Sequence, residues 1–358
     1  MEQLPAAPAV PVQSPALETM SFTGKSGEYF RIWIVNLCLT VITLGIYSPW
    51  AKVRRNKYLY RHSHLAGASF DYHADPVAIL KGRLIAVSML GLYLVTSTVL
   101  PAVSLLIGLV IVLAVPWLLV RSRMFAMRNT SYRNVRFRFK PIYREAYKVI
   151  IGQMLLVIIT FGLFYPRFRY ARSRLIVDNT AYGTLDLKLG DQVDASEFYG
   201  IYLAAGLLFL AVFLLAGVPL MTLGSGGADP DTGVDSSFVW RAFVPTAVLV
   251  VLYLLTYYGL EAAVMRLILR GTSVGDHQLR CDWSLVKLTW VQATNLVAIA
   301  ASLGLLIPWA TIRLQDYKLS KLRVAVQGDL GAIAAAEAEE VSALGDEIGD
   351  AFDYDFGL

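Results

Sequence analysis

The sequence has few charged residues and almost no cysteine. Asp, Glu, Lys and Arg make up 16% of the 358 residues, whereas a soluble domain typically carries about 25%. The two cysteines, Cys38 and Cys281, are too few for a disulfide framework. The sequence also contains no P-loop, dinucleotide fingerprint, nucleophile elbow or HExxH motif. These absences argue against a soluble enzyme, and we expect neither catalytic residues nor a cofactor.

Long apolar segments are abundant instead. Hydrophobic residues make up 56% of the chain, and six segments contain no charged residue: 32–47, 84–120, 149–166, 198–222, 242–260 and 288–312. A bilayer core about 30 Å thick requires roughly 20 apolar residues in a helix. The second segment is too long for one crossing, and Pro101 divides it. The sequence therefore predicts a polytopic α-helical membrane protein with about seven hydrophobic helices.

Three of these segments end in the same way. Adding 117 or 259 to a position in the first gives its counterpart in the other two. Each contains a Gly followed four residues later by a Pro: Gly45 and Pro49, Gly162 and Pro166, Gly304 and Pro308. Gly permits the backbone geometry that ends a helix, and Pro can begin the next helix. We predict a threefold internal repeat, with three equivalent helix-exit corners at one membrane level.

Basic residues follow the first two corners. They are Lys52, Arg54, Arg55, Lys57, Arg167, Arg169, Arg172 and Arg174. By the positive-inside rule these residues predict a cytoplasmic location for the corners. The connection 121–148 carries nine Lys and Arg, so it is predicted to be cytoplasmic too. Only 149–166 lies between the two basic segments, so either this helix dips into or lies along the interface, or a basic loop is translocated against the rule.

Short strand-like segments follow several helices. They alternate in polarity or are rich in β-forming residues, and they lie at 68–73, 134–139, 182–189, 277–281 and 322–326. One such strand is not stable alone. We therefore expect these short β-strands to gather into a small sheet on the cytoplasmic face.

The predicted organisation alternates repeat units with helical hairpins. In chain order it comprises a disordered N-terminal tail (1–19), repeat unit 1 (20–73), a helical hairpin (80–120), repeat unit 2 (128–189), a second helical hairpin (198–266), repeat unit 3 (270–328) and an acidic C-terminal tail (329–358). The loop 223–237 contains three Asp and no cation, so we expect it to be external. The basic connections and the C-terminal tail are then cytoplasmic.

Several polar residues within the apolar segments are candidate sites. The amides Asn36, Gln153 and Asn295 each lie nine residues before a corner glycine. Such groups either mark a transport pathway or, as we favour, bond neighbouring helices. The hydroxyls of Thr43, Thr160 and Ser302 either coordinate an ion or, as we favour, bond back to a carbonyl four residues earlier.

Glu261 is the one acid within an otherwise apolar helix, and Arg266 follows it. It is either a proton or cation site or, in the interpretation we favour, a solvated or paired group near the inner interface. His62, His64 and His73 lie close in sequence, but no cysteine or carboxylate pair completes a ligand set. The loop 229–235 lacks the glutamate that a calcium loop requires. We expect no metal site.

Three segments resemble a known family. They are F-T-G-K-S-G-E-Y-F-R-I-W (22–33), L-T-V-I-T-L-G-I-Y-S-P-W-A-K-V-R-R-N-K-Y (39–58) and G-D-E-I-G-D-A-F-D-Y-D-F (345–356). Together they resemble the YjgN-like family of bacterial inner-membrane proteins, from about residue 20 onward. The resemblance implies a location in a bacterial inner (plasma) membrane. It transfers no catalytic or binding residue, because that family has no established biochemical function.

Two functions are compatible with this pattern. Buried amides and broken helices favour a transporter or channel for an unidentified solute. The alternative is a non-catalytic membrane scaffold that binds anionic lipid headgroups, or a protein partner, through its basic cytoplasmic face. We expect no nucleic-acid partner. The tail 329–358 has nine acids and no Lys or Arg, and we expect it to dock on the basic segments 52–57 and 167–174.

Overall fold

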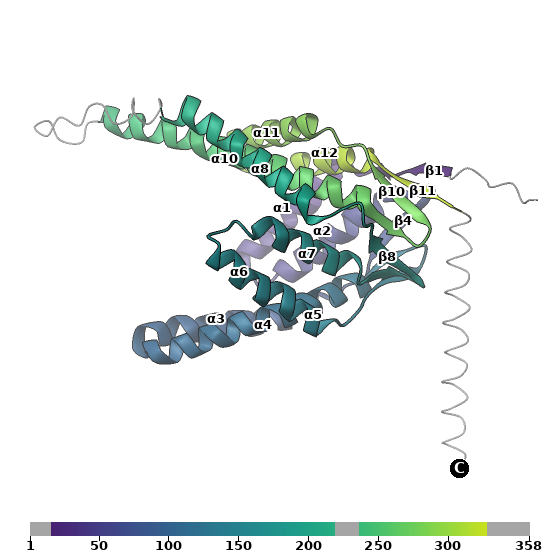
Figure 1. Ribbon diagram of the computed structural model, residues 1–358, viewed down its shortest axis with the longest axis horizontal. Coiled ribbons are helices and arrows are strands. Elements are labelled where there is room, and N and C mark those ends of the chain that lie inside the picture. Colours follow the sequence, from purple (N-terminus) through teal and green to yellow (C-terminus); the bar gives the residue numbers. More distant parts are fainter. Residues whose placement is uncertain (1–15, 219–235, 328–358) are drawn as a thin grey trace, which may run out of the picture.

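Pairs of helices alternate with pairs of short strands along the chain (Figure 1). The structure, a computed structural model, describes residues 16–218 and 236–327. Its helices form five hairpins. Three are simple pairs: α1 (Ser26–Ile42) with α2 (Ser48–Arg61), α3 (Pro76–Val99) with α4 (Pro101–Arg128), and α11 (Leu285–Ala301) with α12 (Ile307–Leu319). In the other two the first arm contains a π-helical turn: α5 (Tyr143–Tyr147), η1 (Lys148–Gly152) and α6 (Gln153–Ile159) pair with α7 (Tyr165–Val177), and α8 (Ala195–Val212) and η2 (Phe213–Gly217) pair with α10 (Ser236–Gly271). Each hairpin therefore leaves the strands and returns to them.

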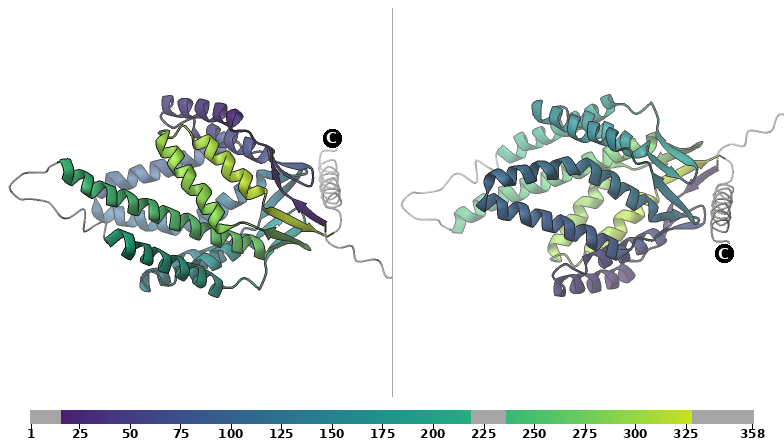
Figure 2. Two further views of the ribbon diagram at one scale, coloured as in Figure 1. Left: turned by 90° about the horizontal axis from the view of Figure 1, so that it is seen from above. Right: turned by 90° about the horizontal axis from the view of Figure 1, so that it is seen from below.

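All the strands of the described residues belong to one antiparallel sheet. Its order is β1-β11-β10-β9-β8-β7-β6-β5-β4-β3-β2. The strands are β1 (Ala16–Thr19), β2 (Ser21–Phe22), β3 (Ser63–Leu65), β4 (Ala68–Tyr72), β5 (Thr130–Tyr132), β6 (Val135–Phe139), β7 (Thr180–Tyr182), β8 (Leu185–Leu189), β9 (Thr272–Val274), β10 (His277–Cys281) and β11 (Leu322–Val326). Figure 2 shows the strands at one end of the molecule, with the helices projecting away from them.

Four β-hairpins in this sheet have the same dimensions. In each, a strand of three residues is joined to a strand of five by a two-residue turn: β3–β4, β5–β6, β7–β8 and β9–β10. The first strand always begins with a hydroxyl residue that bonds the carbonyl four residues earlier, at the end of the preceding helix: Ser63, Thr130, Thr180 and Thr272. This hydroxyl satisfies a helix-end carbonyl at the point where the chain changes from helix to strand.

The sheet is nearly closed and barrel-like. Its two edge strands, β1 and β2, are consecutive in sequence and are separated only by Met20. Buried side chains from strands all round the sheet pack together with Met20: Leu65, Tyr132, Val135, Tyr182, Val324 and Val326. The Tyr132 hydroxyl donates to the Leu65 carbonyl at 2.7 Å, and the Tyr182 hydroxyl donates to the Tyr132 carbonyl at 3.0 Å. Strands distant in sequence are thus tied into one core.

The prediction of seven membrane helices in a threefold repeat, with a few strands on one face, was wrong. In the part of the chain that the structure describes, four helices are long and apolar enough to cross a membrane: Pro76–Val99, Pro101–Arg128, Ala195–Leu215 and Thr246–Gly271. The strands form a nearly closed sheet of eleven, and the described helices form five hairpins rather than three units. Each of the five segments predicted as a strand contains a five-residue strand, and Pro101 does separate two helices.

The excess helices were counted because three apolar segments are each followed by a helix that returns to the sheet. The segments 32–47, 149–166 and 288–312 each end at a corner, and the next helix returns to the sheet. Composition alone does not distinguish a crossing from such a return. The return also removes the conflict between the basic segments before and after 149–166, because α7 runs back from the corner to the sheet and no crossing is needed between those segments (Figure 1).

The three corners share one backbone geometry. A residue with φ near +50° precedes a glycine with φ near +90°: Leu44 (49°) and Gly45 (91°), Phe161 (51°) and Gly162 (90°), Leu303 (50°) and Gly304 (91°). Left-handed backbone is costly for residues with a Cβ and readily adopted by Gly. The apolar residue before each glycine is almost fully exposed, at 94%, 98% and 95% respectively. The corners therefore present apolar side chains outward.

The two long hairpins expose apolar surface along their length. No residue of α3 is buried, and most of the apolar part of α4 is also exposed. The charge-free part of α3 begins directly after Arg83, whose guanidinium donates to the Ser48 hydroxyl beside the α1–α2 corner. This contact places the corner near the level at which the apolar surface of α3 begins. In Figure 2 the two long hairpins, α3–α4 and α8–α10, extend further from the strands than the three hairpins that end in corners.

Some predictions concern residues at the edges of the described ranges. The predicted external loop 223–237 lies outside them, apart from the first two residues of α10, and the acidic tail from 329 lies outside them entirely. Residues 16–19, which we assigned to the N-terminal tail, form strand β1 and pair with β11. The tail assignment therefore extended four residues too far into the sheet.

Candidate functional site

The basic residues of α2 form two stripes at helical spacing. Lys52 and Arg55 line a cavity that also includes Ser48, whereas Arg54 and Lys57 line a separate depression with Arg61. Residues three or four apart share a helix face, so each stripe presents its charges in one direction. Arg54 donates to the Tyr47 hydroxyl at 3.1 Å.

The cavity beside Lys52 and Arg55 lies between α1, α2 and α3 and is called here the α1–α3 cavity. Its volume is about 460 Å³. Its walls combine aromatic, amide, hydroxyl and cationic groups: Tyr29, Trp33, Asn36, Leu37, Thr40, Ser48, Ala51, Lys52, Arg55 and Arg83. Burial raises the pKa of the Tyr29 hydroxyl, so this wall residue adds no negative charge near neutral pH.

Two further cavities adjoin the α1–α3 cavity through shared wall residues. One, of about 660 Å³, shares Lys52 and is lined by α3, α4 and β6, with Arg121, Arg128 and Arg136. The other, of about 550 Å³, shares Tyr29, Trp33 and Arg55 and reaches α12 and the sheet. We call these three adjoining spaces the cationic cavities.

The charge in the cationic cavities has one sign. Six cations line them and no Asp or Glu does: Lys52, Arg55, Arg83, Arg121, Arg128 and Arg136. Among the described residues, none of the six forms a salt bridge. Apolar side chains such as Leu37, Ile79 and Leu118 complete the walls. A cluster of cations without acidic partners beside apolar surface can bind an anionic amphiphile.

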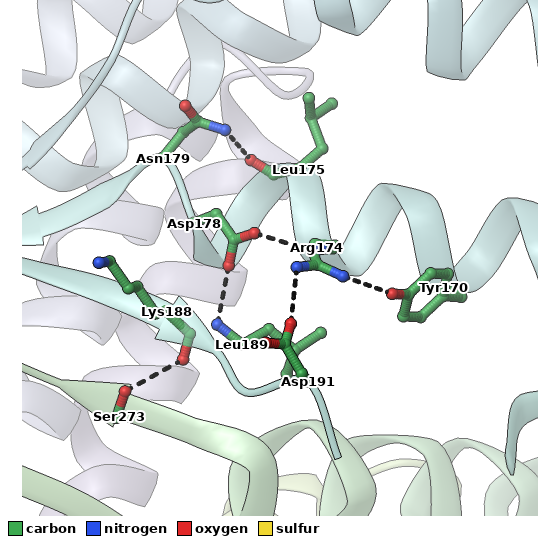
Figure 3. Close-up of polar contacts among 9 residues, drawn as sticks. All are labelled: Tyr170, Arg174, Leu175, Asp178, Asn179, Lys188, Leu189, Asp191 and Ser273. Atoms are coloured by element: carbon green, nitrogen blue, oxygen red, sulfur yellow. Dashed lines mark hydrogen bonds and ion pairs between the residues drawn. The ribbon is translucent and has the colours of Figure 1, made fainter. Parts of the chain in front are cut away.

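The cations of α7 are engaged differently. Arg174 contacts the Tyr170 hydroxyl at 2.7 Å and the carboxylates of Asp178 and Asp191 at 3.2 Å each (Figure 3). The bond with Tyr170, followed by that with Asp178, raises the pKa of Arg174. Asp178 also accepts from the Leu189 amide at 2.7 Å. Arg174 therefore joins α7 to the turn after β8, and its guanidinium already has two carboxylate partners.

Arg169 is paired across helices. Its guanidinium donates to the Glu261 carboxylate on α10 at 2.8 Å, and its side chain is 18% exposed. Burial opposes its charge, but Glu261, Tyr202 and Tyr165 outweigh burial and raise the pKa of Arg169. Glu261 is therefore part of an ion pair between α7 and α10. Arg167 lies over the Tyr170 ring, and Arg172 is half-buried on α7.

The three amides lie in three different hairpins. Asn36 Nδ2 donates to the Ala51 carbonyl at 3.5 Å, and Asn295 Nδ2 donates to the Ala310 carbonyl at 3.2 Å. Each of these bonds joins the two helices of one hairpin, as expected of packing contacts. Gln153 Oε1 is buried without a partner. Among the hydrogen bonds of the described residues, none joins two of these amides.

The three corner hydroxyls are fully used within their corners. Thr43 and Thr160 each donate to a carbonyl four residues earlier at 2.7 Å, and Ser302 donates to one three residues earlier at 3.2 Å. Each hydroxyl oxygen also accepts from the backbone amide four residues later, at 3.0 or 3.1 Å. They thereby fasten the end of one helix to the start of the next.

The three sequence-adjacent histidines point to separate partners. His62 contacts the Tyr58 carbonyl at 2.7 Å, His64 contacts the Thr23 hydroxyl at 3.0 Å and His73 contacts the Ser131 hydroxyl at 2.8 Å. In the described ranges no three His, Cys, Asp or Glu side chains are grouped as metal ligands would be. These histidines thus connect strands and helix ends of the sheet region.

Several cavity residues were not identified from the sequence. Arg83 and Arg121 flank the charge-free segment 84–120, which is a signal that could have marked them as boundary residues. Arg128 and Arg136 belong to the basic connection 121–148, but neither they nor Trp33 could be assigned to a site, because these residues come together only through packing of α1, α4 and β6. The position of Arg83 and Arg121 at the ends of the apolar segment places the cavities at the boundary of the apolar surface, on the sheet side.

Comparison with known proteins gives the family but no function. The family model described as "Bacterial protein of unknown function (DUF898)" matches residues 18–351. Proteins named "Inner membrane protein YjgN" from Salmonella typhimurium, Escherichia coli O157:H7 and Escherichia coli K12 are 30%, 28% and 29% identical over 145 residues, which is 39–40% of this chain and 36% of each relative. No solved structure matches.

The chain thus spans about a third of the length of the curated relatives that it matches. Their names confirm the resemblance drawn from the sequence, and the four long apolar helices fit a membrane protein. A match over residues 18–351 covers most of the chain. The protein belongs to the DUF898 family of bacterial proteins of unknown function.

Proposed function

We propose that this protein is a bacterial inner-membrane protein that binds anionic phospholipid in its cationic cavities, with the sheet facing the cytoplasm. The observation that carries the proposal is the set of six cations without an acidic partner in adjoining cavities. These cavities lie where the apolar surface of α3 and α4 begins. A phospholipid phosphate and its acyl chains would meet cations and apolar surface at that boundary.

The pairing of the cations favours one localised site for a lipid headgroup over a weak attraction of the whole basic surface to the bilayer. Each Lys or Arg near an anionic bilayer surface contributes about 1 kcal/mol of attraction. On α7 that attraction is reduced because Arg169 and Arg174 already have carboxylate partners. Lys52, Arg55 and Arg83 have none among the described residues and converge on one cavity. The first helical hairpin and α3 should therefore hold the lipid.

Transport of a solute is the competing function. It was suggested by amides that could converge within the bilayer, but Asn36 and Asn295 each bond the partner helix of their own hairpin. Flux measurements on protein reconstituted in liposomes, with a panel of ions and small solutes, separate the two functions. Protein-dependent flux of one solute that is abolished when Asn36, Gln153 and Asn295 are replaced by Leu would favour transport over lipid binding.

The direct test is lipid binding to purified protein. Native mass spectrometry in detergent should show tighter binding of phosphatidylglycerol than of phosphatidylcholine. Arg55→Gln should weaken phosphatidylglycerol binding about fivefold, because it removes about 1 kcal/mol of attraction. Lys57→Gln removes the same charge from the other stripe of α2 and should have a smaller effect. Equal affinity for the two lipids would overturn the proposal, and equal losses in both variants would overturn the assignment to the cavities.

A further inference from the structure

We propose that the α1–α3 cavity selects an anionic phospholipid whose headgroup carries hydroxyl donors, the class of the glycerol phosphodiesters. The inference deepens the proposed function and rests on it. It names a feature of the ligand that charge alone does not determine. Its structural basis is Asn36, a buried amide in the cavity wall.

Asn36 has an acceptor without a donor. The side chain is 7% exposed, and its Oδ1 has no hydrogen-bond partner. Its Nδ2 is directed to the Ala51 carbonyl on α2, at 3.5 Å. Buried polar atoms are nearly always hydrogen-bonded, so an unpaired one calls for an explanation. Oδ1 itself is sealed from solvent, but Asn36 lines the α1–α3 cavity, so a bound ligand that displaces this side chain can supply the missing donor.

The α11–α12 hairpin shows how the same amide is satisfied without a ligand. Asn295 donates to Ala310 as Asn36 does to Ala51, and its Oδ1 accepts from the Arg313 guanidinium at 3.1 Å. The residue at the position of Arg313 in the first hairpin is Arg54, three residues after the alanine in both cases. Arg54 donates to the Tyr47 hydroxyl instead. The acceptor that an arginine fills in the α11–α12 hairpin is buried and unpaired in the first hairpin.

The chemistry of the walls limits which donor can enter. Lys52, Arg55 and Arg83 require an anion. A phosphate diester has only acceptor oxygens at neutral pH, so it satisfies the cations but not Asn36 Oδ1. An ammonium group would be repelled by the three cations. A hydroxyl is a neutral donor, so a phosphodiester that also carries hydroxyls satisfies both parts of the cavity.

The cavity fits the headgroup of such a lipid. Its volume of about 460 Å³ lies within the range of small-molecule sites. Leu37 in its wall is 41% exposed, and Val41, one turn further along α1, is 65% exposed. These side chains form an apolar path from the cavity toward the α1–α2 corner. Acyl chains can therefore leave the cavity along α1 while the headgroup remains among the cations.

The test compares probes that differ only in the headgroup. Phosphatidylglycerol, phosphatidylmethanol and phosphatidylcholine with identical acyl chains are bound to the full-length protein and to Asn36→Leu, with affinities measured by native mass spectrometry. Phosphatidylmethanol has the same charge as phosphatidylglycerol but no hydroxyl. The soluble compound sn-glycerol 3-phosphate is added as a competitor, because a free metabolite could offer the same chemistry as a lipid headgroup.

We expect the wild-type protein to bind phosphatidylglycerol about fivefold more tightly than phosphatidylmethanol, the ratio expected for one hydrogen bond. Asn36→Leu should abolish this ratio, so that the variant binds phosphatidylglycerol and phosphatidylmethanol with equal affinity. Equal binding of the two anionic lipids by the wild type, with both preferred to phosphatidylcholine, overturns this inference but supports the proposed function. No preference over phosphatidylcholine overturns the proposed function itself. Binding of sn-glycerol 3-phosphate as tight as that of the lipid overturns the assignment to a lipid.

Discussion

Replacing the corner glycine Gly162 by Ala tests the backbone geometry of the corners. Gly162 has φ of +90°, and a Cβ built on it would meet no atom within 4 Å. The substitution therefore introduces no steric clash, and its cost comes from the backbone alone. A residue with a Cβ pays about 1–2 kcal/mol in left-handed conformation. We expect Gly162→Ala to lower the free energy of unfolding by that amount, and Gly162→Val, which is β-branched, to lower it further.

The same hairpin offers a matched control. Gly152 has φ of −62° and ψ of −48°, which is helical backbone, and a Cβ built on it also meets nothing within 4 Å. Gly→Ala at such a position raises stability by about 0.5–1 kcal/mol. The two variants add one methyl group each to exposed positions, yet they should shift the free energy of unfolding in opposite directions. We expect them to differ by about 1.5–3 kcal/mol.

Unfolding in mixed micelles, titrated with sodium dodecyl sulfate and followed by circular dichroism, measures both changes. Thermal melting gives an independent ranking. The wild-type protein should fall between Gly152→Ala and Gly162→Ala in both assays. A Gly162→Ala variant at least as stable as the wild type would refute the left-handed corner. A shift of the same sign and size in both variants would show that the corner glycine has no special backbone role.

Four further predictions follow from individual contacts and charges. Glu261→Gln should destabilise the protein by about 1–3 kcal/mol in the same titration, below the 3–5 of a fully buried pair, because the Glu261 side chain is 35% exposed. Burial lowers the pKa of His277 below 6.5, so its contribution to stability is complete above about pH 6.5 and is lost as the pH falls toward the folded pKa. His277→Gln should therefore reduce the dependence of the melting temperature on pH across that interval. Tyr132→Phe should cost about 1–2 kcal/mol, because its buried hydroxyl bonds a carbonyl of β3 at 2.7 Å. Deleting 337–358 removes eight acids and should strengthen sedimentation with anionic liposomes at low salt, and an unchanged affinity would contradict docking of the tail.

Local features of the fold were predictable because local residues determine them. The corners follow from Gly45, Gly162 and Gly304, since few other residues adopt φ near +90°. The five-residue strands were found from alternation and from preceding turn residues. The three-residue strands, such as β3 and β5, are too short to show alternation. Sheet closure depends on pairing of β1 with β11, more than 300 residues away, which no local pattern indicates.

The candidate site was predicted only in part for a similar reason. Lys52 and Arg55 were identified as basic residues after a corner, but so were Arg169 and Arg174, which the structure shows to be paired with carboxylates. Only tertiary packing determines which cations acquire a partner. The role of Asn36 likewise depends on whether a neighbouring arginine reaches its oxygen. The number of membrane crossings was overestimated because hydropathy records composition and not the direction in which the chain continues.

Photocrosslinking with a phospholipid that carries a photoreactive group next to its headgroup tests the central claim most directly. The probe is bound to the protein in bilayer nanodiscs, and the adducts are mapped by mass spectrometry of peptides. Lipid bound in the cationic cavities should label their wall residues on α1, α2 and α3, such as Trp33, Leu37 and Ala51, and excess phosphatidylglycerol but not phosphatidylcholine should suppress that labelling. Labelling spread evenly over the exposed helices, or unaffected by either competitor, would contradict a lipid site in these cavities.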